Sequence, residues 1–305
     1  MNKCVDIVVT YNRIDFLKEN INSLQNQTYI KHDIMIIDNA STDGTSEWIK
    51  KIKDSRVKYF NTGENLGGAG GFAFGIKKAF EIGYEYAWIM DDDSIPEKFA
   101  LESLIKKAKI LDNKFSFIAS LVYWTDRKIF PMNFPSIKYK KNYQKNIDLI
   151  STKKIIEIDS CSFVGCFINL KCAIQTALPI SEFFIYGDDI EYTTRLEKIL
   201  PAYLDIDSII IHKAPTNKGA EIFSVSADRI HRFYLQSRNG MYIARKNNEV
   251  LKRLAVVFKR FIKIVFEAPN YKLKRIWLLI SGTFSGMFFN PKLVYYELIN
   301  KKGEK

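Results

Sequence analysis

Tyr86-Ala87-Trp88-Ile89-Met90 runs directly into Asp91-Asp92-Asp93. An apolar run of this length is typical of a buried strand, and the three carboxylates follow where that strand leaves the core. Like charges at one point repel one another unless a cation neutralises them. Mg²⁺ and Mn²⁺ prefer oxygen ligands and often bridge to the phosphates of a nucleotide. The stretch therefore predicts either a metal site at a strand end or a solvated acidic turn.

Strands and helices alternate around this stretch. Apolar runs at 5–9, 34–37 and 57–60 predict three strands, and helical spacing of apolar residues follows each of them. Further strands are predicted near 117–122, 155–159 and 202–211. Elements of these lengths indicate right-handed βαβ units and a mostly parallel, Rossmann-like sheet, in which ligands bind at the carboxyl ends of the strands.

Charge divides the chain into two parts. The 305 residues can bury a large core, and we expect a catalytic domain at 1–215 followed by a helical, basic region at 216–305. The net charge of +12 is concentrated in that second region. Such a field attracts polyanions or anionic lipid headgroups.

One predicted helix of the basic region is amphipathic. Its apolar stripe consists of Phe258, Phe261, Ile262 and Phe266, which stand among Lys259, Arg260 and Lys263. This pattern fits a helix lying in a membrane interface, and it equally fits a packing helix with a solvated basic face.

The cysteines and the chain start bear on location. The four cysteines have no zinc-ligand spacing, and three of them lie in apolar runs, which is typical of buried thiols in a reducing compartment. The chain enters a strand at once without a signal-peptide pattern, and no stretch is long and apolar enough to span a bilayer. We therefore expect a cytoplasmic protein, peripheral at the inner face of the cell membrane.

Polar clusters follow three of the first four predicted strands. Thr10-Tyr11-Asn12-Arg13 offers backbone amides, an aromatic face and a cation, and Asp38 can accept a hydrogen bond from a nucleobase or ribose. Asn65 with Gly67 and Gly68 allows close backbone approach at a helix start that favours anions. Each cluster alone also fits an ordinary turn. The glycine run matches neither the dinucleotide fingerprint nor the phosphate-binding loop, which argues against a dehydrogenase or a P-loop enzyme.

A second acidic cluster, Tyr186-Gly187-Asp188-Asp189-Ile190-Glu191, lies at a predicted helix start. Asp188 and Glu191 have the spacing of a helix-capping pair, which would leave Asp189 free to face a cleft as a general base. His212 ends an apolar strand and is either a structural histidine or a nitrogen ligand that completes a metal site.

In this order, the clusters resemble the inverting family-two glycosyltransferases with the GT-A fold, over about Val5 to Lys213. The segments Asn65–Phe72 and Trp88–Asp93 look most like bacterial galactofuranosyltransferases. Tyr234–Asn239 also resembles a tyrosine/arginine–asparagine motif of galactofuranosyl- and rhamnosyltransferases. The family often has Trp before its Asp pair, where this chain has Gly187, which puts the acceptor and sugar contacts of that loop in question.

The resemblance implies a role for each cluster. Asp189 would be the catalytic base, and a Mn²⁺ or Mg²⁺ ion would be held by Asp91, Asp93 and His212. Contacts with the acceptor or the sugar are implied for Trp88, Tyr186 and Asp188. The nucleotide sugar would be bound by Thr10, Tyr11, Asn12, Arg13, Asp38, Asn65, Gly67, Gly68, Asp91 and Asp92.

The implied reaction is inverting transfer of galactofuranose from a UDP-sugar to a hydroxyl of a glycan or lipid-linked glycan, in bacterial cell-surface polysaccharide synthesis. A rhamnosyltransferase that uses dTDP-rhamnose is the alternative of the same class. A nucleotidyltransferase usually needs an early phosphate-gripping loop, for which Asn12-Arg13 is a thin candidate. A non-catalytic polyanion-binding protein would leave both acidic clusters unexplained. Basic and aromatic residues are not interleaved on one platform, so nucleic acid is not an expected partner.

Overall fold

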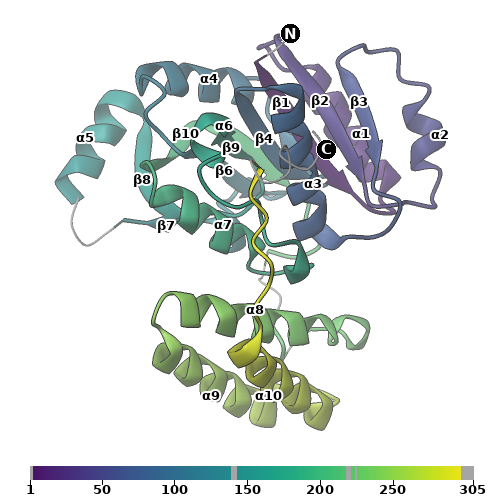
Figure 1. Ribbon diagram of the computed structural model, residues 1–305, viewed down its shortest axis with the longest axis vertical. Coiled ribbons are helices and arrows are strands. Elements are labelled where there is room, and N and C mark those ends of the chain that lie inside the picture. The colour runs from purple at the N-terminus through teal and green to yellow at the C-terminus, as the bar shows by residue number, and fades with distance from the viewer. Residues whose placement is uncertain (1–2, 139–142, 218–220, 224, 297–305) are drawn as a thin grey trace, which may run out of the picture.

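A large mixed sheet carries the upper part of the molecule (Figure 1). The computed structural model describes residues 3–138, 143–217, 221–223 and 225–296, whereas 297–305, at the end of the predicted basic region, lie outside the described residues. The strands are β1 Cys4–Thr10, β2 His32–Asp38, β3 Val57–Asn61, β4 Tyr86–Asp91, β5 Ser94–Pro96, β6 Phe117–Trp124, β7 Ser136–Ile137, β8 Ile155–Ser160, β9 Cys166–Asn169 and β10 Ala202–His212.

The strand order is β3-β2-β1-β4-β9-β6-β10-β8-β7, with β5 paired to β10. β1 to β4 pair in parallel, and β6 pairs in parallel with β10. β9 is antiparallel to both of its neighbours. The predicted mostly parallel α/β sheet is confirmed.

The helices cover the sheet and form a separate layer below it (Figure 1). Their bounds are α1 Ile14–Gln25, α2 Thr45–Ile49, α3 Gly67–Ile82, α4 Ala100–Ile110, α5 Tyr143–Lys153, α6 Leu170–Ala173, α7 Asp188–Glu197, α8 Arg232–Lys246, α9 Val250–Glu267 and α10 Lys272–Phe288, with 3₁₀ turns at Pro131–Asn133, Ser181–Phe183 and Ala227–Arg229.

Strand alternation divides the core between the two faces of the sheet. Val5, Ile7 and Val9 of β1 belong to a cluster with apolar residues of α3 and α7. Cys4 and Val8, which point the other way, belong to a second cluster with residues of α1 and α4. Because side chains of a strand alternate with period two, each central strand feeds both cores and reads as a continuous apolar run.

The glycine run lies inside α3 and not in a loop. A Cβ on Gly71 would lie 2.6 Å from Val9 Cγ1, and a Cβ on Gly75 would lie 2.6 Å from Ile7 Cγ2. These glycines let α3 approach β1 more closely than any other residue would allow. Gly71 and Gly75 therefore serve the packing of α3 against the sheet.

α8, α9 and α10 form the lower layer in Figure 1, where α9 and α10 lie furthest from the sheet. Gly282 and Gly286, which interrupt the apolar run in the sequence, do not break α10. A Cβ on Gly282 would lie 2.5 Å from Tyr234 O, and a Cβ on Gly286 would lie 2.4 Å from Arg238 O, so the pair allows α10 to pack closely on α8. Within the described part of the chain, no helix has the length and apolar character needed to cross a membrane.

Candidate functional site

The strand ends predicted to share one edge do so. Thr10 pairs in register with Asp38, Asp38 with Asn61, and Val9 with Asp91. β10 runs parallel to β6 and brings His212 to the same edge, beside Ser94 of β5. Segments that are far apart in sequence therefore meet at the carboxyl ends of the central strands.

One arginine compensates much of the charge of the triple aspartate. Arg13 Nη1 lies 2.9 Å from Asp92 Oδ1, and Arg13 Nη2 donates to Asp93 Oδ2 at 2.8 Å. Thr10 Oγ1 donates to Asp92 Oδ2 at 2.8 Å. The Arg13 guanidinium also lies over the Phe16 ring, 4.4 Å from its centroid.

The three carboxyls differ in acidity. Burial, with the nearby Asp93 charge, raises the pKa of Asp91 to about 6. Burial also raises the pKa of Asp92 to about 7, outweighing the opposing effects of Arg13 and Thr10. For Asp93, His212 and Arg13 outweigh burial and lower the pKa to about 2. Asp93 is therefore the member of the cluster that is most firmly ionised.

A hydrogen bond at Nδ1 orients the imidazole ring of His212. Asn133 Nδ2 donates to Ser162 Oγ at 2.9 Å, which turns Asn133 Oδ1 toward His212 Nδ1 at 2.7 Å. A neutral imidazole that donates from Nδ1 presents an unprotonated Nε2, the form in which histidine binds metals. His212 Nε2 lies 3.2 Å from Asp93 Oδ1.

The Asp93–His212 pair fits a divalent ion. Asp93 Oδ1 is buried and has no hydrogen-bond partner among the described residues. Two ligand atoms at right angles on an octahedral ion, each about 2.1 Å from it, stand roughly 3 Å apart. The predicted three-residue shell is not assembled, however, because no group of three His, Cys, Asp or Glu side chains in the described residues converges on one point. Asp91 does not join the pair. An ion held by one carboxylate and one imidazole, with phosphate and water oxygens, fits this edge.

Asp189 lies in the first turn of α7. Its Oδ1 accepts from the Ile190 amide at 2.8 Å, which leaves Oδ2 available. Burial raises the pKa of Asp189 to about 6. The charge of Asp189 contributes to the raised pKa of Asp91, so the two acidic clusters act on each other.

The predicted capping pair is wrong. Gly187, in the left-handed conformation, is the N-cap of α7, and no side chain makes a capping hydrogen bond. Asp188 is the first helical residue, and Glu191 instead pairs with Arg195 Nε at 2.8 Å. Asp188 is buried, and burial, with the Asp189 charge, holds its pKa well above the usual range of an aspartate.

The loop before Asp189 is strained and braced. Phe184, Tyr186 and Gly187 all have positive φ angles, of 62°, 70° and 84°. The side-chain amide of Asn239, from α8, lies within 3.0 Å of three carbonyl oxygens of this loop, those of Phe183, Ile185 and Tyr186. A left-handed aromatic residue is costly unless its surroundings hold it in place. Asn239 holds this loop, together with the Ala69 amide, which donates to Phe184 O at 3.2 Å.

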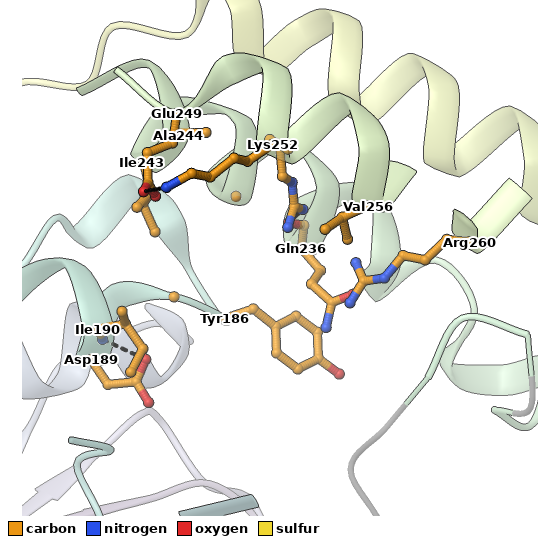
Figure 2. Close-up of a pocket in the computed structure, with 13 residues that line it drawn as sticks. Tyr186, Asp189, Ile190, Gln236, Ile243, Ala244, Glu249, Lys252, Val256 and Arg260 are labelled. Atoms are coloured by element: carbon orange, nitrogen blue, oxygen red, sulfur yellow. Dashed lines mark hydrogen bonds and ion pairs between the residues drawn. The ribbon is translucent and has the colours of Figure 1, made fainter. Parts of the chain in front are cut away.

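A cavity of about 440 Å³ opens beside Asp189. Tyr186, Asp189 and Ile190 line it on one side, and α8 and α9 line it on the other with Gln236, Lys252 and Arg260 among their residues (Figure 2). The aspartate thus stands between the strand-end edge and a cavity that the helical layer completes.

The residues predicted to hold the nucleotide fall into two groups. Tyr11, Asn12, Asn65 and Gly68 retain exposed surface at the strand-end edge. Asp38 is fully buried, and its two oxygens accept from the Ser41 amide and from the Tyr59 hydroxyl.

Thr10 and Asp92 are also buried, and they are hydrogen bonded to each other. Contact of Asp38, Thr10 or Asp92 with a nucleotide would require these buried side chains to become accessible.

Two predicted contacts are wrong. Gly67 is covered, since a Cβ there would lie 2.2 Å from Phe184 O, so its backbone is not open to a phosphate. Trp88 has no exposed surface and belongs to the core with Val8 and Met90, so it cannot touch a sugar or an acceptor. Strand alternation directs Trp88 into the core on the side of the sheet covered by α1 and α4, and only the end of β4 and the residues after it reach the edge.

Sequence reasoning missed the residues that act through distant contacts. Asn133 orients His212 from 79 positions away, and nothing local marks it. Asn239 belongs to the motif Tyr234–Asn239, which by itself assigns it no role. Arg253, which lines the cavity, has no local feature that separates it from the other cations of the basic region.

Known proteins resemble this chain in sequence and in fold. Residues 7–170 match the family described as Glycosyl transferase family 2. Galactofuranosyltransferase GlfT1 of Mycolicibacterium smegmatis is 22% identical over 251 residues, which cover 80% of this chain and 81% of that protein.

Two solved structures share the fold. Staphylococcus aureus TarS 1–349 in complex with UDP has a TM-score of 0.54 and 16% identity, covering 94% of this chain and 72% of that one. GalNAc-T7 with UDP, GalNAc and Mn²⁺ has a TM-score of 0.60 and 14% identity, covering 79% of this chain and 47% of that one. The fold of this chain is the GT-A fold expected from its sequence.

Proposed function

Because the chain belongs to glycosyl transferase family 2, we propose that it is an inverting enzyme that transfers galactofuranose from a UDP-sugar to a hydroxyl of a glycan or lipid-linked glycan in bacterial cell-surface polysaccharide synthesis. One observation carries the proposal. Asp93 and His212 lie together at the strand-end edge, and Asp189, a carboxylate in the first turn of α7, lines a cavity together with residues of α8 and α9. The sequence similarity to a galactofuranosyltransferase supports the donor sugar.

Family membership decides against the nucleotidyltransferase and the polyanion-binding protein. A rhamnosyltransferase using dTDP-rhamnose remains an outcome of the donor test below.

Each residue has a definite task in this mechanism. Asp93 and His212 would hold Mn²⁺ or Mg²⁺, with Arg13 as a further cation at the same edge. The bound ion would supply positive charge that offsets the negative charge of the departing diphosphate. Asp189 accepts the proton of the acceptor hydroxyl while the hydroxyl oxygen attacks the anomeric carbon. The bond from that carbon to the diphosphate oxygen breaks on the opposite face, so the configuration inverts and UDP leaves with the electron pair.

The test is turnover with a panel of donors, UDP-galactofuranose, UDP-galactopyranose and dTDP-rhamnose, each with Mn²⁺ or with EDTA. We expect turnover with UDP-galactofuranose and Mn²⁺, and NMR of the product should show the anomeric configuration inverted. A preference for dTDP-rhamnose would make the protein a rhamnosyltransferase. Retention of configuration would contradict the assignment of Asp189 as a base acting on the acceptor.

Replacing Asp93 with alanine is expected to remove metal-dependent nucleotide binding. A ligand present at 100 times its Kd stabilises the folded state by about 2.7 kcal/mol, which a thermal melt resolves. In the wild type, Mn²⁺ should increase the stabilisation by UDP. In Asp93→Ala this increase should vanish, whereas Asp148→Ala, an exposed carboxylate on α5, should retain it. An undiminished Mn²⁺ effect in Asp93→Ala would remove Asp93 from the metal site.

The exposed surfaces of α9 and α10 support the proposal that the protein binds a membrane. Two exposed apolar stripes at helical spacing lie on α9 and α10. On α9 the stripe is Leu251, Leu254, Phe258, Ile262 and Phe266, and on α10 it is Leu273, Trp277, Ile280, Phe284 and Phe288. The exposed cations Lys252, Lys259, Lys272 and Lys274 stand among them. An apolar face with basic neighbours suits the interface of an anionic bilayer.

Vesicle co-sedimentation tests the membrane partner. Binding should rise as anionic lipid replaces neutral lipid, and it should fall sharply in Phe258→Glu and in Trp277→Glu. Ile147→Glu, an exposed apolar residue on α5, is the matched control and should bind as the wild type does. Binding that is indifferent to anionic lipid would remove the electrostatic contribution, and binding unaffected by both variants would remove the docking face.

A further inference from the structure

The cavity beside Asp189 is distinct from the donor edge. None of the residues from Thr10 to Arg13, and none of Asp91 to Asp93, lines it. Its volume of about 440 Å³ falls within the range of small-molecule sites. It touches the proposed base on one side and α9 on the other, which is the place an acceptor would occupy.

Arg253 is seated in this cavity by a glycine. A Cβ on Gly240 of α8 would lie 2.2 Å from Arg253 Nη2, so a residue with a side chain at position 240 would displace the guanidinium. Arg253 Nη2 donates to Gln236 O at 3.1 Å. The guanidinium is therefore held in a fixed position against α8.

Among the described residues, no acidic side chain neutralises the charge of Arg253. Its Nε is buried without a hydrogen-bond acceptor, and no carboxylate of the described residues lies within ion-pair distance of it. Burial, together with the neighbouring Arg260, lowers the pKa of Arg253 to about 10. A partly buried cation beside another cation costs free energy, which a bound anion would offset.

The other two cations of the cavity each have a carboxylate nearby. Lys252 Nζ lies 2.6 Å from Glu249 Oε1, and Arg260 Nη2 lies 3.8 Å from Glu221 Oε2. Arg260 still points its guanidinium back toward Gln236 and Tyr186 in Figure 2. Arg253 and Arg260 therefore both line the cavity, and Asp189 is the carboxylate that lines it with them.

We propose that this cavity is a phosphate subsite for the acceptor, in which Arg253, with Arg260, binds a phosphate group of a phosphate-bearing saccharide while a hydroxyl of that saccharide meets Asp189. The inference rests on the proposed function and narrows its acceptor class. Guanidinium groups match the geometry and charge of phosphate, and two of them suit a group with more than one anionic oxygen better than a single carboxylate. α9 carries the exposed apolar stripe on the same helix, so an acceptor joined to lipid through phosphate would extend toward the docking face.

The experiment uses the whole protein and a matched pair of soluble probes, phenyl galactoside and galactose 1-(phenyl phosphate), which differ in the phosphate alone. Calorimetry in EDTA, without donor, measures binding independently of transfer. The wild type should bind the phosphodiester roughly tenfold or more tightly than the neutral probe, the factor of one charge-assisted hydrogen bond. Inorganic phosphate should compete with the phosphodiester, showing that the anion itself is recognised.

Two variants probe Arg253. Arg253→Gln removes the cation, and Gly240→Ala displaces it without removing it. Both should abolish the preference for the phosphodiester and leave the affinity for the neutral probe unchanged. Lys259→Gln, an exposed cation of the same helix that does not line the cavity, should keep the preference.

Equal affinity of the wild type for the two probes would overturn the subsite. An equal loss of affinity for both probes in the variants would also overturn it. Tighter binding of a uronic acid glycoside than of the phosphodiester would also overturn the phosphate assignment. Absence of transfer with every donor, with the binding preference intact, would instead count against the proposed function.

Discussion

Replacing Asp189 with asparagine is expected to lower the rate of sugar transfer by a factor on the order of 10² to 10⁴, the contribution of a general base. The substitution keeps the shape of the side chain and the bond that its Oδ1 accepts from the Ile190 amide. UDP binding with Mn²⁺ should persist, because Asp93, His212 and Arg13 are untouched. Asp148→Asn is the matched control and should transfer at the wild-type rate. Full turnover in Asp189→Asn would refute the base assignment.

The same carboxylate gives the reaction its expected pH dependence. Burial raises the pKa of Asp189 to about 6, and only the ionised form can accept a proton. Turnover should therefore fall as pH drops through about 6, and it should be level above that point. Asp91 and Asp92, with pKa values raised to about 6 and about 7, titrate in the same range, so the comparison with Asp189→Asn assigns the fall to Asp189. The residual activity of Asp189→Asn should lack it.

Replacing Asn239 with aspartate is expected to damage both stability and catalysis. The new carboxylate would face the carbonyl oxygens of Phe183, Ile185 and Tyr186 and would donate to none of them. Arg238 Nε, which donates to Asn239 Oδ1 at 3.0 Å, would offset part of the new charge, so the expected cost lies below the roughly 3–5 kcal/mol of an unpaired buried charge. Asn239→Ala leaves the carbonyls unsatisfied without the charge, at about 1–3 kcal/mol.

A kinetic measurement separates the positioning role of Asn239 from its contribution to stability. If the amide holds the loop that presents Asp189, Asn239→Ala should lower kcat by roughly 10²-fold with an unchanged KM for the donor, even well below its melting temperature. Asn247→Asp, an exposed position at the end of α8, should show neither effect. A kcat that recovers fully on cooling would reduce Asn239 to a purely structural residue.

The fold was largely predictable because its central elements are locally encoded. The apolar run before Asp91 and the helical spacing of Leu17, Ile21 and Leu24 depend on neighbours within a few residues, and both predicted elements are confirmed. The shared edge followed from sheet topology alone, since parallel strands end on the same side. Asp93 and His212 were found together for that reason.

The errors arose where distant parts of the chain decide the outcome. Gly67 carries the signature of an open turn, but Phe184, more than a hundred positions later, covers it. Asp188 and Glu191 have the spacing of a capping pair, yet Glu191 forms an ion pair with Arg195, and Gly187 is the N-cap of the helix. Asn239 and Arg253 gain their roles only from packing against other elements, which spacing along the chain does not record.

A crystal structure with UDP and Mn²⁺ tests the proposed metal site, because the anomalous signal of manganese locates the ion. We expect a single strong peak in contact with Asp93 and His212, bridged to the diphosphate, with Asp189 facing the open side of the site. A peak remote from both residues, or UDP bound away from the ends of β1 and β4, would contradict the proposed site.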